Sequence, residues 1–244
     1  MNTCTRNQRH LQEFQIQQQY YGSTACRYDQ MHVSGDDEHD FALSFLVGLA
    51  TFLRAESILD IGSGTGRAIR RIKRDLPKLR AIGIEPSDSL RNVGVNKFGL
   101  GKEELISGDA LDLDFPSNSF DIVCEFGVLH HIKTPDVAVN EMLRVARKAI
   151  FISDSNNFGQ GNLPSRMIKQ FLNSLKMWRV VDYIKTGGKG YILSDGDGLS
   201  YSYSVFNNYG MIEKNCRTVH VMNTMGKSIN HYRDAGHVVV IGVL

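Results

Sequence analysis

The chain has 244 residues, of which 42% are hydrophobic and 22% are charged, values typical of a folded globular protein and not of a disordered one. Its 28 lysines and arginines nearly balance 26 aspartates and glutamates, so the formal net charge of +2 indicates no strong field toward nucleic acid or an anionic membrane. The longest apolar stretch, residues 41–53, is well short of the roughly 20 residues that a membrane span needs. We therefore expect no membrane span.

The start of the chain and the cysteines favour one cellular compartment over others. Residues 1–19 are polar and rich in glutamine, without the apolar region of a secretory signal. The four cysteines are widely separated and form no Cys-x-x-Cys pair or Cys/His cluster, although zinc sites need ligands at short paired spacings. We expect a cytoplasmic protein with reduced thiols and no bound metal.

Short β-branched runs recur along the chain, each followed by a turn and a helical pattern. The expected strands are residues 57–61, 81–84, 103–107, 120–124 and 149–153. The expected helices are residues 67–76, 87–97 and 136–147. Near-continuous apolar strands separated by helices predict a parallel sheet covered on both faces. Right-handed crossovers make this a Rossmann-like, doubly wound α/β fold.

Two segments lie outside this alternation and divide the chain. Residues 1–37 form a polar leader with several aromatic residues, and residues 156–208 form an insertion rich in Gly, Ser and Tyr. The core then comprises residues 38–155 and 209–244. We expect the leader and the insertion to form a lid over one sheet edge, with the insertion on the substrate side, because long loops of this kind are usually functional.

The insertion and the chain end show few regular hydrophobic patterns. The insertion contains one helical pattern, over residues 165–178. The chain ends with two apolar runs, residues 217–222 and 237–244, joined by a segment too short for a crossover helix. We therefore expect an antiparallel final pair.

A glycine-rich turn follows the first expected strand. It reads Asp60-Ile61-Gly62-Ser63-Gly64-Thr65-Gly66, and glycines let the backbone turn tightly and let a ligand approach closely. The dinucleotide fingerprint would need a small residue at Arg67, and the acidic Asp60 would repel a pyrophosphate. A nicotinamide cofactor is thus disfavoured, although a simple tight turn remains open.

Acidic residues stand at the ends of the next strands. Glu85, followed by Pro86, ends the second strand, where a carboxylate can accept hydrogen bonds from both hydroxyls of a ribose. Asp109 and Ala110 end the third strand, where a carboxylate and a backbone N–H could bind an adenine edge. Glu125 ends the fourth strand and opens onto the same crevice. Each acid alone could be a surface residue or a helix cap, but together they indicate a binding site.

This set of motifs resembles the class I S-adenosylmethionine-dependent methyltransferases, especially the small-molecule enzymes with a Val-Leu-His-His-type segment after the fourth strand. The resemblance covers about residues 45–153, and the terminal strand pair fits the family's seven-stranded sheet, mostly parallel with an antiparallel last strand. DNA amino-methyltransferases carry an Asn/Asp-Pro-Pro-aromatic motif where this chain has Glu125-Phe126-Gly127. DNA is therefore not expected as a substrate.

The resemblance implies S-adenosyl-L-methionine as cofactor, with S-adenosyl-L-homocysteine as product. It implies that the glycine-rich turn holds the amino-acid half, that Glu85 with Pro86 holds the ribose, and that Asp109 and Ala110 bind the adenine. The family often folds its N-terminal segment across the cofactor, which implicates Tyr28. The cofactor-binding residues implied are Asp60, Gly62, Ser63, Gly64, Gly66, Glu85, Pro86, Asp109, Ala110, Phe126, Leu129 and Tyr28.

Transfer to a hydroxyl needs a general base, whereas a neutral amine needs little beyond alignment. His131 and His130 follow the fourth strand at the mouth of the crevice, and we favour His131 as the base. Either histidine could instead pack at a helix start. Glu125 could orient the substrate or the methionyl amine, or be a solvated carboxylate. Asn156 and Asn157 could hydrogen-bond a polar acceptor.

These features predict methyl transfer to an O or N atom of a small polar metabolite or a glycan precursor. An alternative keeps the chemistry but makes the acceptor a macromolecule, tRNA or protein, on the evidence of the basic residues between Arg67 and Arg80. A solvated face explains those residues as well, so RNA is not favoured. A further alternative is a regulatory subunit that binds the cofactor without catalysis. The sequence leaves the oligomeric state open.

Overall fold

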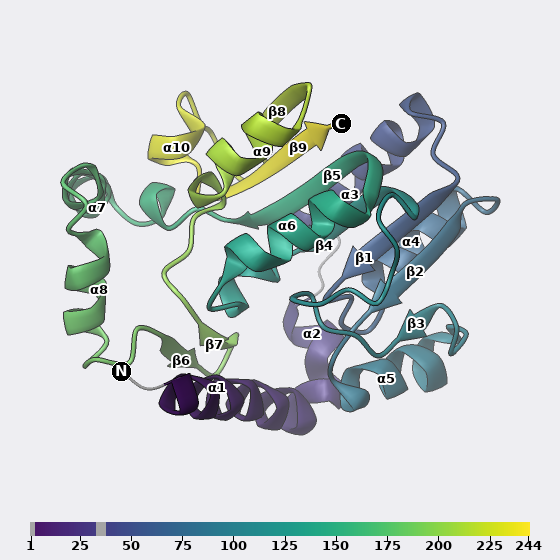
Figure 1. Cartoon of the computed structure of the whole chain (residues 1–244), viewed down its shortest axis with the longest axis horizontal. Helices are drawn as coiled ribbons and strands as arrows, with labels where there is room; N and C mark the ends of the chain where they lie inside the picture. Colours follow the sequence, from purple (N-terminus) through teal and green to yellow (C-terminus); the bar gives the residue numbers. More distant parts are fainter. Residues whose placement is uncertain (1–2, 33–37) are drawn as a thin grey trace.

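The computed structural model describes residues 3–32 and 38–244. Within these ranges, seven strands form the main sheet in the order β3-β2-β1-β4-β5-β9-β8 (Figure 1). They are β1 (Ser57–Ile61), β2 (Arg80–Ile84), β3 (Leu105–Ile106), β4 (Phe120–Phe126), β5 (Ala146–Ser155), β8 (Thr218–Asn223) and β9 (His237–Val243). β9 pairs antiparallel with both neighbours, and the other pairs are parallel. The predicted Rossmann-like sheet with an antiparallel last strand is thus confirmed.

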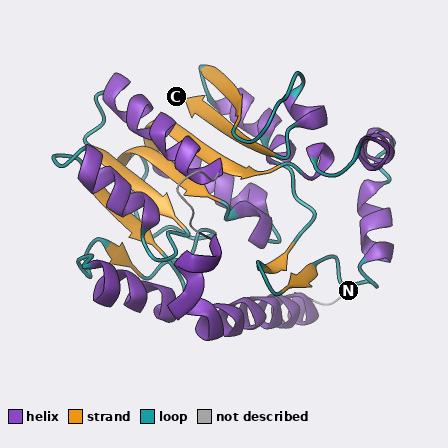
Figure 2. Cartoon of the chain, turned by 180° about the vertical axis from the view of Figure 1, so that it is seen from behind, coloured by secondary structure: helices purple, strands orange, loops and turns teal. Residues whose placement is uncertain are grey.

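Helices cover both faces of the sheet, as Figures 1 and 2 show from opposite sides. They are α3 (Glu38–Phe52), α4 (Arg67–Asp75), α5 (Asp88–Phe98), α6 (Pro135–Val145), α9 (Tyr209–Asn215) and the short α10 (His231–Asp234). On one face, Leu46 of α3 and Ile69 of α4 pack against buried strand residues. On the other face, Met142 of α6 and Ile212 of α9 do the same. The two apolar layers hold the carboxyl ends of the strands in fixed positions.

Two boundaries in the core differ from the predictions. The helix expected to end at residue 147 ends at Val145, because Ala146 already pairs with Phe120 of β4. The third strand pairs over only two residues, because β3 is the edge strand and bonds to β2 alone. Tertiary pairing, not local propensity, sets both limits.

The leader and the insertion contain more helix than the pattern predicted. The leader forms α1 (Thr3–Thr24), η1 (Ala25–Arg27) and α2 (Tyr28–His32). The single helix expected over residues 165–178 is wrong, because the chain turns at Lys176, which has a φ of 59°, and divides the segment in two. The insertion contains η3 (Asn157–Gly159), α7 (Leu163–Ser174), α8 (Trp178–Lys185) and a hairpin of β6 (Ile192–Ser194) and β7 (Gly198–Ser200).

The leader packs directly against the β6–β7 hairpin, and Figure 1 shows α1 running beside it. The Gln17 side-chain oxygen accepts a hydrogen bond from the Leu199 N–H at 2.7 Å, and the Tyr201 hydroxyl donates to Glu13 at 3.0 Å. The Leu199 carbonyl in turn accepts a bond from His131, just beyond β4. Leader and hairpin therefore meet over the carboxyl end of β4.

Candidate functional site

Two adjoining cavities open where the central strands end. The large cavity has a volume of about 740 Å³ and the small cavity about 150 Å³. Seven residues line both: Tyr21, Tyr28, Gly62, Phe126, Gly127, His131 and Tyr201. They come from the leader, the turn after β1, the end of β4 and the insertion. The cavities meet at these residues.

The glycine-rich turn forms the floor between the cavities. Gly62 and Gly64 have φ angles of 63° and 56°, which side chains rarely adopt. A Cβ at position 62 would lie 2.5 Å from a methyl of Val128, and one at position 64 would lie 3.3 Å from the Tyr28 ring. Glycine is required here for both conformation and close approach. Asp60 and Ser63 line the large cavity, and the Ser63 hydroxyl donates to the Asp60 carboxylate.

Glu85 lies directly after β2 on the wall of the small cavity, beside Pro86. It is only 4% exposed, and its two carboxylate oxygens accept the N–H groups of Gly64, at 3.0 Å, and Ser87, at 2.8 Å. The carboxylate therefore supports the glycine-rich turn as well as facing the cavity. Burial raises the pKa of Glu85 to about 7, against the lowering effect of these two backbone bonds.

The far end of the small cavity is formed by Asp109 and Ala110. The Asp109 carboxylate accepts the Leu111 N–H at 2.9 Å, which closes a tight turn, and its side chain is exposed. Leu90 and Leu111 add apolar walls. A flat, partly apolar group with polar edges suits this end of the cavity.

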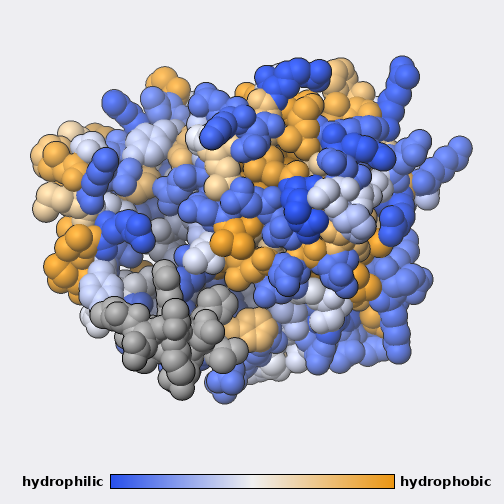
Figure 3. All heavy atoms as spheres, in the orientation of Figure 1, coloured by the Kyte–Doolittle hydropathy of each residue, from blue (hydrophilic) through white to orange (hydrophobic). Residues whose placement is uncertain are grey.

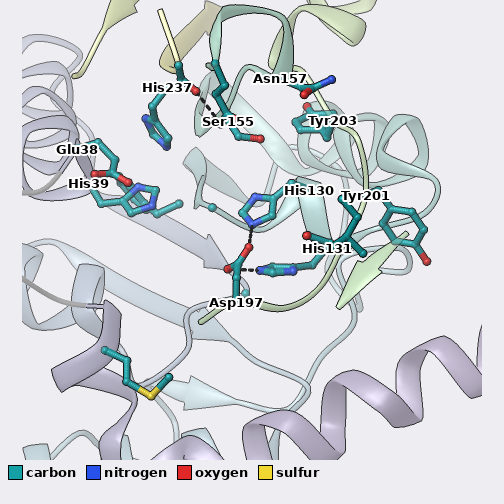
Figure 4. Close-up of a pocket in the computed structure, with 18 of the residues that line it drawn as sticks. Glu38, His39, His130, His131, Ser155, Asn157, Asp197, Tyr201, Tyr203 and His237 are labelled. Atoms are coloured by element: carbon teal, nitrogen blue, oxygen red, sulfur yellow. Dashed lines mark hydrogen bonds and ion pairs between the residues drawn. The ribbon is translucent and has the colours of Figure 1, made fainter. Parts of the chain in front are cut away.

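His130, His131 and Asp197 face the large cavity close to one another (Figure 4). His130 and His131 lie in η2 (Leu129–His131), and His130 Nδ1 donates to the buried Asp154 carboxylate at 2.7 Å. Asp197, in the β6–β7 turn, lies between the two rings, 3.4 Å from His130 Nε2 and 3.5 Å from His131 Nε2. The insertion thus contributes an acid to a site whose bases belong to the core.

Nearby charges shift the pKa values of His130 and Asp197. Burial alone would lower the pKa of His130, but the carboxylates of Asp154 and Asp197 outweigh burial and raise that pKa well above its usual value. Burial likewise opposes ionisation of Asp197, but hydrogen bonds from both histidines hold the pKa of that carboxyl below its usual range. His130 is therefore an imidazolium cation near neutral pH and cannot accept a proton there.

Three residues predicted to belong to the site line neither cavity. Gly66 begins α4 with a φ of 80°, and a Cβ there would lie 2.2 Å from Leu100, so it serves packing. Leu129 is fully buried in the core. Glu125 is also fully buried and accepts the Val128 N–H at 2.8 Å, so its interpretation as a solvated carboxylate is wrong. Burial raises the pKa of Glu125 well above its usual value.

Known proteins resemble the part of the chain that forms these cavities. Residues 59–152 match a family model described as "Methyltransferase domain". The chain carries a class I S-adenosylmethionine-dependent methyltransferase domain. The relatives that match this methyltransferase domain include the ubiquinone/menaquinone biosynthesis C-methyltransferase UbiE of Pseudomonas putida, 29% identical over 133 residues that make up 52% of each chain. A demethylmenaquinone methyltransferase of Roseiflexus castenholzii is 33% identical over 36% of this chain and 37% of its own length.

The matched region thus spans about half the length of these relatives, or less. Solved structures of low identity share the fold of the methyltransferase domain over nearly the whole chain. The magnesium protoporphyrin IX methyltransferase of Synechocystis with bound SAH has a TM-score of 0.59 at 14% identity, covering 95% of this chain and 99% of that one. A Thermotoga maritima methyltransferase, described as a possible histamine N-methyltransferase, has a TM-score of 0.55 at 18% identity, with coverage of 92% and 98%.

Sequence reasoning missed several residues around the methyltransferase domain. Asp197 was not identified as a site residue, and its approach to His131 depends on how the insertion folds back. His39, from α3, and His237, from β9, line the large cavity with Ser155 but carry no local motif. The glycine-rich segment 194–198 contains two aspartates, which was the one available signal for Asp197.

The two asparagines after β5 have different roles. Asn156 is fully buried, and its amide nitrogen donates to the carbonyls of Tyr232 and Ala235, each at 2.9 Å. It therefore holds the chain before β9 in place, and its predicted contact with an acceptor is wrong. Asn157 does line the large cavity, where its amide donates to the Ser202 hydroxyl at 2.8 Å.

Two groups in the large cavity have the composition of cation ligands. His130, His131 and Asp197 each place one ligand atom within 4.8 Å of the others, and so do Glu38, His39 and His237. In the first group, His130 already pairs with the carboxylates of Asp154 and Asp197. The expectation that no metal is bound stays a prediction.

The buried carboxyls of the methyltransferase domain predict an unusual pH dependence of stability. Burial raises the pKa of Asp60 and of Glu85 to about 7 each, whereas unfolded carboxyls titrate near 4. Between about pH 4 and 7 the folded state keeps protons that the unfolded state has lost, so the free energy of unfolding falls as pH rises. The variant Asp60→Asn, neutral at every pH, should show a shallower fall in urea unfolding. An identical pH dependence in the two proteins would contradict this prediction.

Proposed function

We propose that the protein transfers a methyl group from S-adenosylmethionine to an O or N atom of a small polar molecule, a metabolite or a glycan precursor. The observation that carries this proposal is the meeting of the two cavities at His131. The small cavity has the groups that suit a nucleoside, and the large cavity has titratable groups and room for an acceptor. Alignment of two bound reactants is the main contribution that a protein makes to such a transfer.

The small cavity fits the nucleoside half of the cofactor. We assign Glu85, with Pro86, to the ribose hydroxyls, and Asp109 with the Ala110 backbone to the adenine. Gly62 and Gly64 line the small cavity in a turn packed too closely on Val128 and Tyr28 for a Cβ, and Asp60 and Ser63 face the large cavity beside it. We assign these four residues to the methionyl part, and Phe126 and Tyr28 to the wall between the cavities. The bound cofactor supplies an electrophilic methyl group on sulfur.

His131 is the residue that we assign to proton removal from the acceptor. Its Nδ1 lies 2.6 Å from the Leu199 carbonyl, which can only accept, so Nδ1 carries the hydrogen. Nε2, 3.5 Å from the Asp197 carboxylate, faces the large cavity, and it bears the lone pair once the proton that it shares with Asp197 has left. A hydroxyl acceptor would lose its proton to this Nε2 as its oxygen attacks the methyl carbon. His130 remains a cation that holds Asp197 close.

We assign the leader (residues 1–37) and the insertion (residues 156–208) to a lid outside the core. Tyr28 lies over Gly64, and Asp29 binds both Thr65, at 2.5 Å, and Arg70, at 2.9 Å. These contacts tie the leader to the glycine-rich turn. A lid of this kind keeps water from the reacting groups.

Methylation of carbon is the second candidate. Relatives such as UbiE are named as C-methyltransferases of ubiquinone and menaquinone biosynthesis. A hydroxylated ring that loses a proton to His131 becomes nucleophilic at ring carbons as well as at oxygen. The same histidine would therefore serve both reactions, and product analysis distinguishes them.

A macromolecular acceptor has less support. The basic side chains of α4 and the loop after it are largely engaged with acids: Arg70 pairs with Asp29, Arg71 with Asp75, and Lys73 with Glu104. Such pairs neutralise the field that would attract a nucleic acid.

Calorimetric titration tests the proposed cofactor. S-adenosylhomocysteine should bind with a dissociation constant of the order of micromolar, and NAD should give no heat of binding. Screening of acceptors with labelled methyl donor then follows, and the position of the label separates O-, N- and C-methylation. Binding of NAD but not of S-adenosylhomocysteine would overturn the proposal. Cofactor binding without transfer to any acceptor would favour the regulatory subunit.

A further inference from the structure

The helices α7 and α8 expose an extended apolar surface. Figure 3 shows hydrophobic residues at the edge where Figure 1 places these two helices. Among the described residues, no other segment of similar length exposes as many large hydrophobic side chains. The apolar face is defined by Leu163, Met167, Ile168, Phe171, Leu175, Met177, Val180, Tyr183 and Ile184, with exposed fractions from 48% to 71%. Patches of this kind on a folded protein mark interaction surfaces.

The orientation of α7 is the reverse of an ordinary surface helix. Its polar side chains point inward: Lys169 donates to the Gln160 carbonyl at 2.9 Å, Gln170 to the Phe158 carbonyl at 3.0 Å, and Asn173 to the Tyr232 hydroxyl at 2.9 Å. None of its residues is buried. A helix facing water normally buries its apolar stripe. This arrangement is favourable only if something apolar lies outside the helix.

The helix α8 lies between the large cavity and the outer surface that carries the apolar face. Trp178, Asp182 and Lys185 recur at helical spacing and line the large cavity. Val180 and Ile184 point away from it and are 59% and 71% exposed. α8 is therefore both a wall of the large cavity and part of the apolar face.

Charge indicates what covers this face. Lys176, Arg179 and Lys189 are exposed around it, and the one acid within residues 163–190, all of them described, is the half-buried Asp182. A helix with an apolar face flanked by cations lies in the plane of a membrane interface, where its cations meet anionic headgroups. None of the described helices is long and apolar enough to cross a bilayer, so any membrane contact of this segment is at the surface.

We propose that α7 and α8 dock on an anionic lipid bilayer. The apolar face enters the boundary between headgroups and acyl chains, and Lys176, Arg179 and Lys189 contact headgroup phosphates. Docking places the α8 wall of the large cavity against the membrane. This inference concerns binding alone, so it holds or fails independently of methyl transfer.

Vesicle flotation tests the proposal with the full-length protein and no acceptor. The protein should bind phosphatidylcholine vesicles containing phosphatidylglycerol, and binding should weaken as salt increases. The double variant Phe171→Ser, Ile184→Ser should reduce the partition coefficient by about tenfold or more. The matched control Phe52→Ser removes an aromatic ring that is 82% exposed on α3, and it should bind as the wild type does.

A charge variant completes the test. Lys176→Glu with Arg179→Glu should abolish the preference for phosphatidylglycerol while the melting temperature stays unchanged, since both side chains are exposed. Equal binding to vesicles of phosphatidylcholine alone would overturn the role of the cations. Failure to bind either vesicle would overturn the proposal, as would a protein dimer that dissociates on Phe171→Ser substitution and ignores vesicles.

Discussion

His131→Ala is expected to lower kcat by about 10²–10⁴-fold, the contribution typical of a general base. The cofactor should still bind, because the groups assigned to the ribose and adenine belong to the small cavity and remain. The imidazole that the variant lacks is the one whose Nε2 faces the large cavity beside Asp197. Measurement requires the acceptor found with the labelled methyl donor, and added imidazole should restore part of the lost rate.

A surface histidine provides the control for this variant. His220 is exposed on β8, and His220→Ala should leave kcat unchanged. A normal rate in His131→Ala would show that this residue only packs at the end of η2 and takes no proton. An equal loss of rate and of cofactor affinity would point to a collapse of the junction between the cavities.

Glu85→Ala is expected to weaken the binding of S-adenosylhomocysteine by about 10–100-fold, the effect of losing a charged hydrogen-bond acceptor. The structure adds a second consequence. Removing the carboxylate leaves the N–H groups of Gly64 and Ser87 without their partners, which costs about 1–3 kcal/mol of stability for each buried group. Glu85→Gln keeps an acceptor oxygen and should retain most of the stability while losing affinity.

The pH dependence of binding strengthens this test. A ribose hydroxyl donates better to an ionised carboxylate, and the pKa of Glu85 is about 7 before the cofactor binds. Affinity in the wild type should therefore fall as pH decreases below about 7, whereas in Glu85→Gln the fall should be shallower, since only Asp60 then titrates in this range beside the cofactor. Glu213→Ala, an exposed acid on α9, is the control. Unchanged affinity in Glu85→Ala would mean that the ribose is bound elsewhere.

The sequence by itself determined the sheet and the residues at its carboxyl edge. Alternation of apolar runs with helical patterns predicts parallel strands, and strand ends of a parallel sheet lie at one edge. Gly62, Glu85 and Asp109 could therefore be grouped although they are far apart in the chain. The glycines were identifiable because their role is local, set by backbone conformation and close approach.

Only the tertiary structure decided which side chains face the cavities. Glu125 lies near the end of β4, and Leu129 and His131 follow that strand, yet the first two are buried and the third faces both cavities. The difference arises in the turn of η2, where the Asp154 carboxylate accepts the Leu129 N–H at 2.8 Å. Such a contact joins η2 to β5 and has no local pattern. Burial of a carboxyl such as Glu125 cannot be inferred from its polarity.

The insertion shows this limit most clearly. Asp197 reaches His130 and His131 because the β6–β7 hairpin packs on α1, which depends on contacts among three separate segments. The apolar stripe of α7 is visible in the sequence, but its direction is not, because periodicity specifies which residues share a face and not what that face contacts. The net charge of +2 also conceals the cations around this face, since charge sums over the chain and binding depends on where the charges lie.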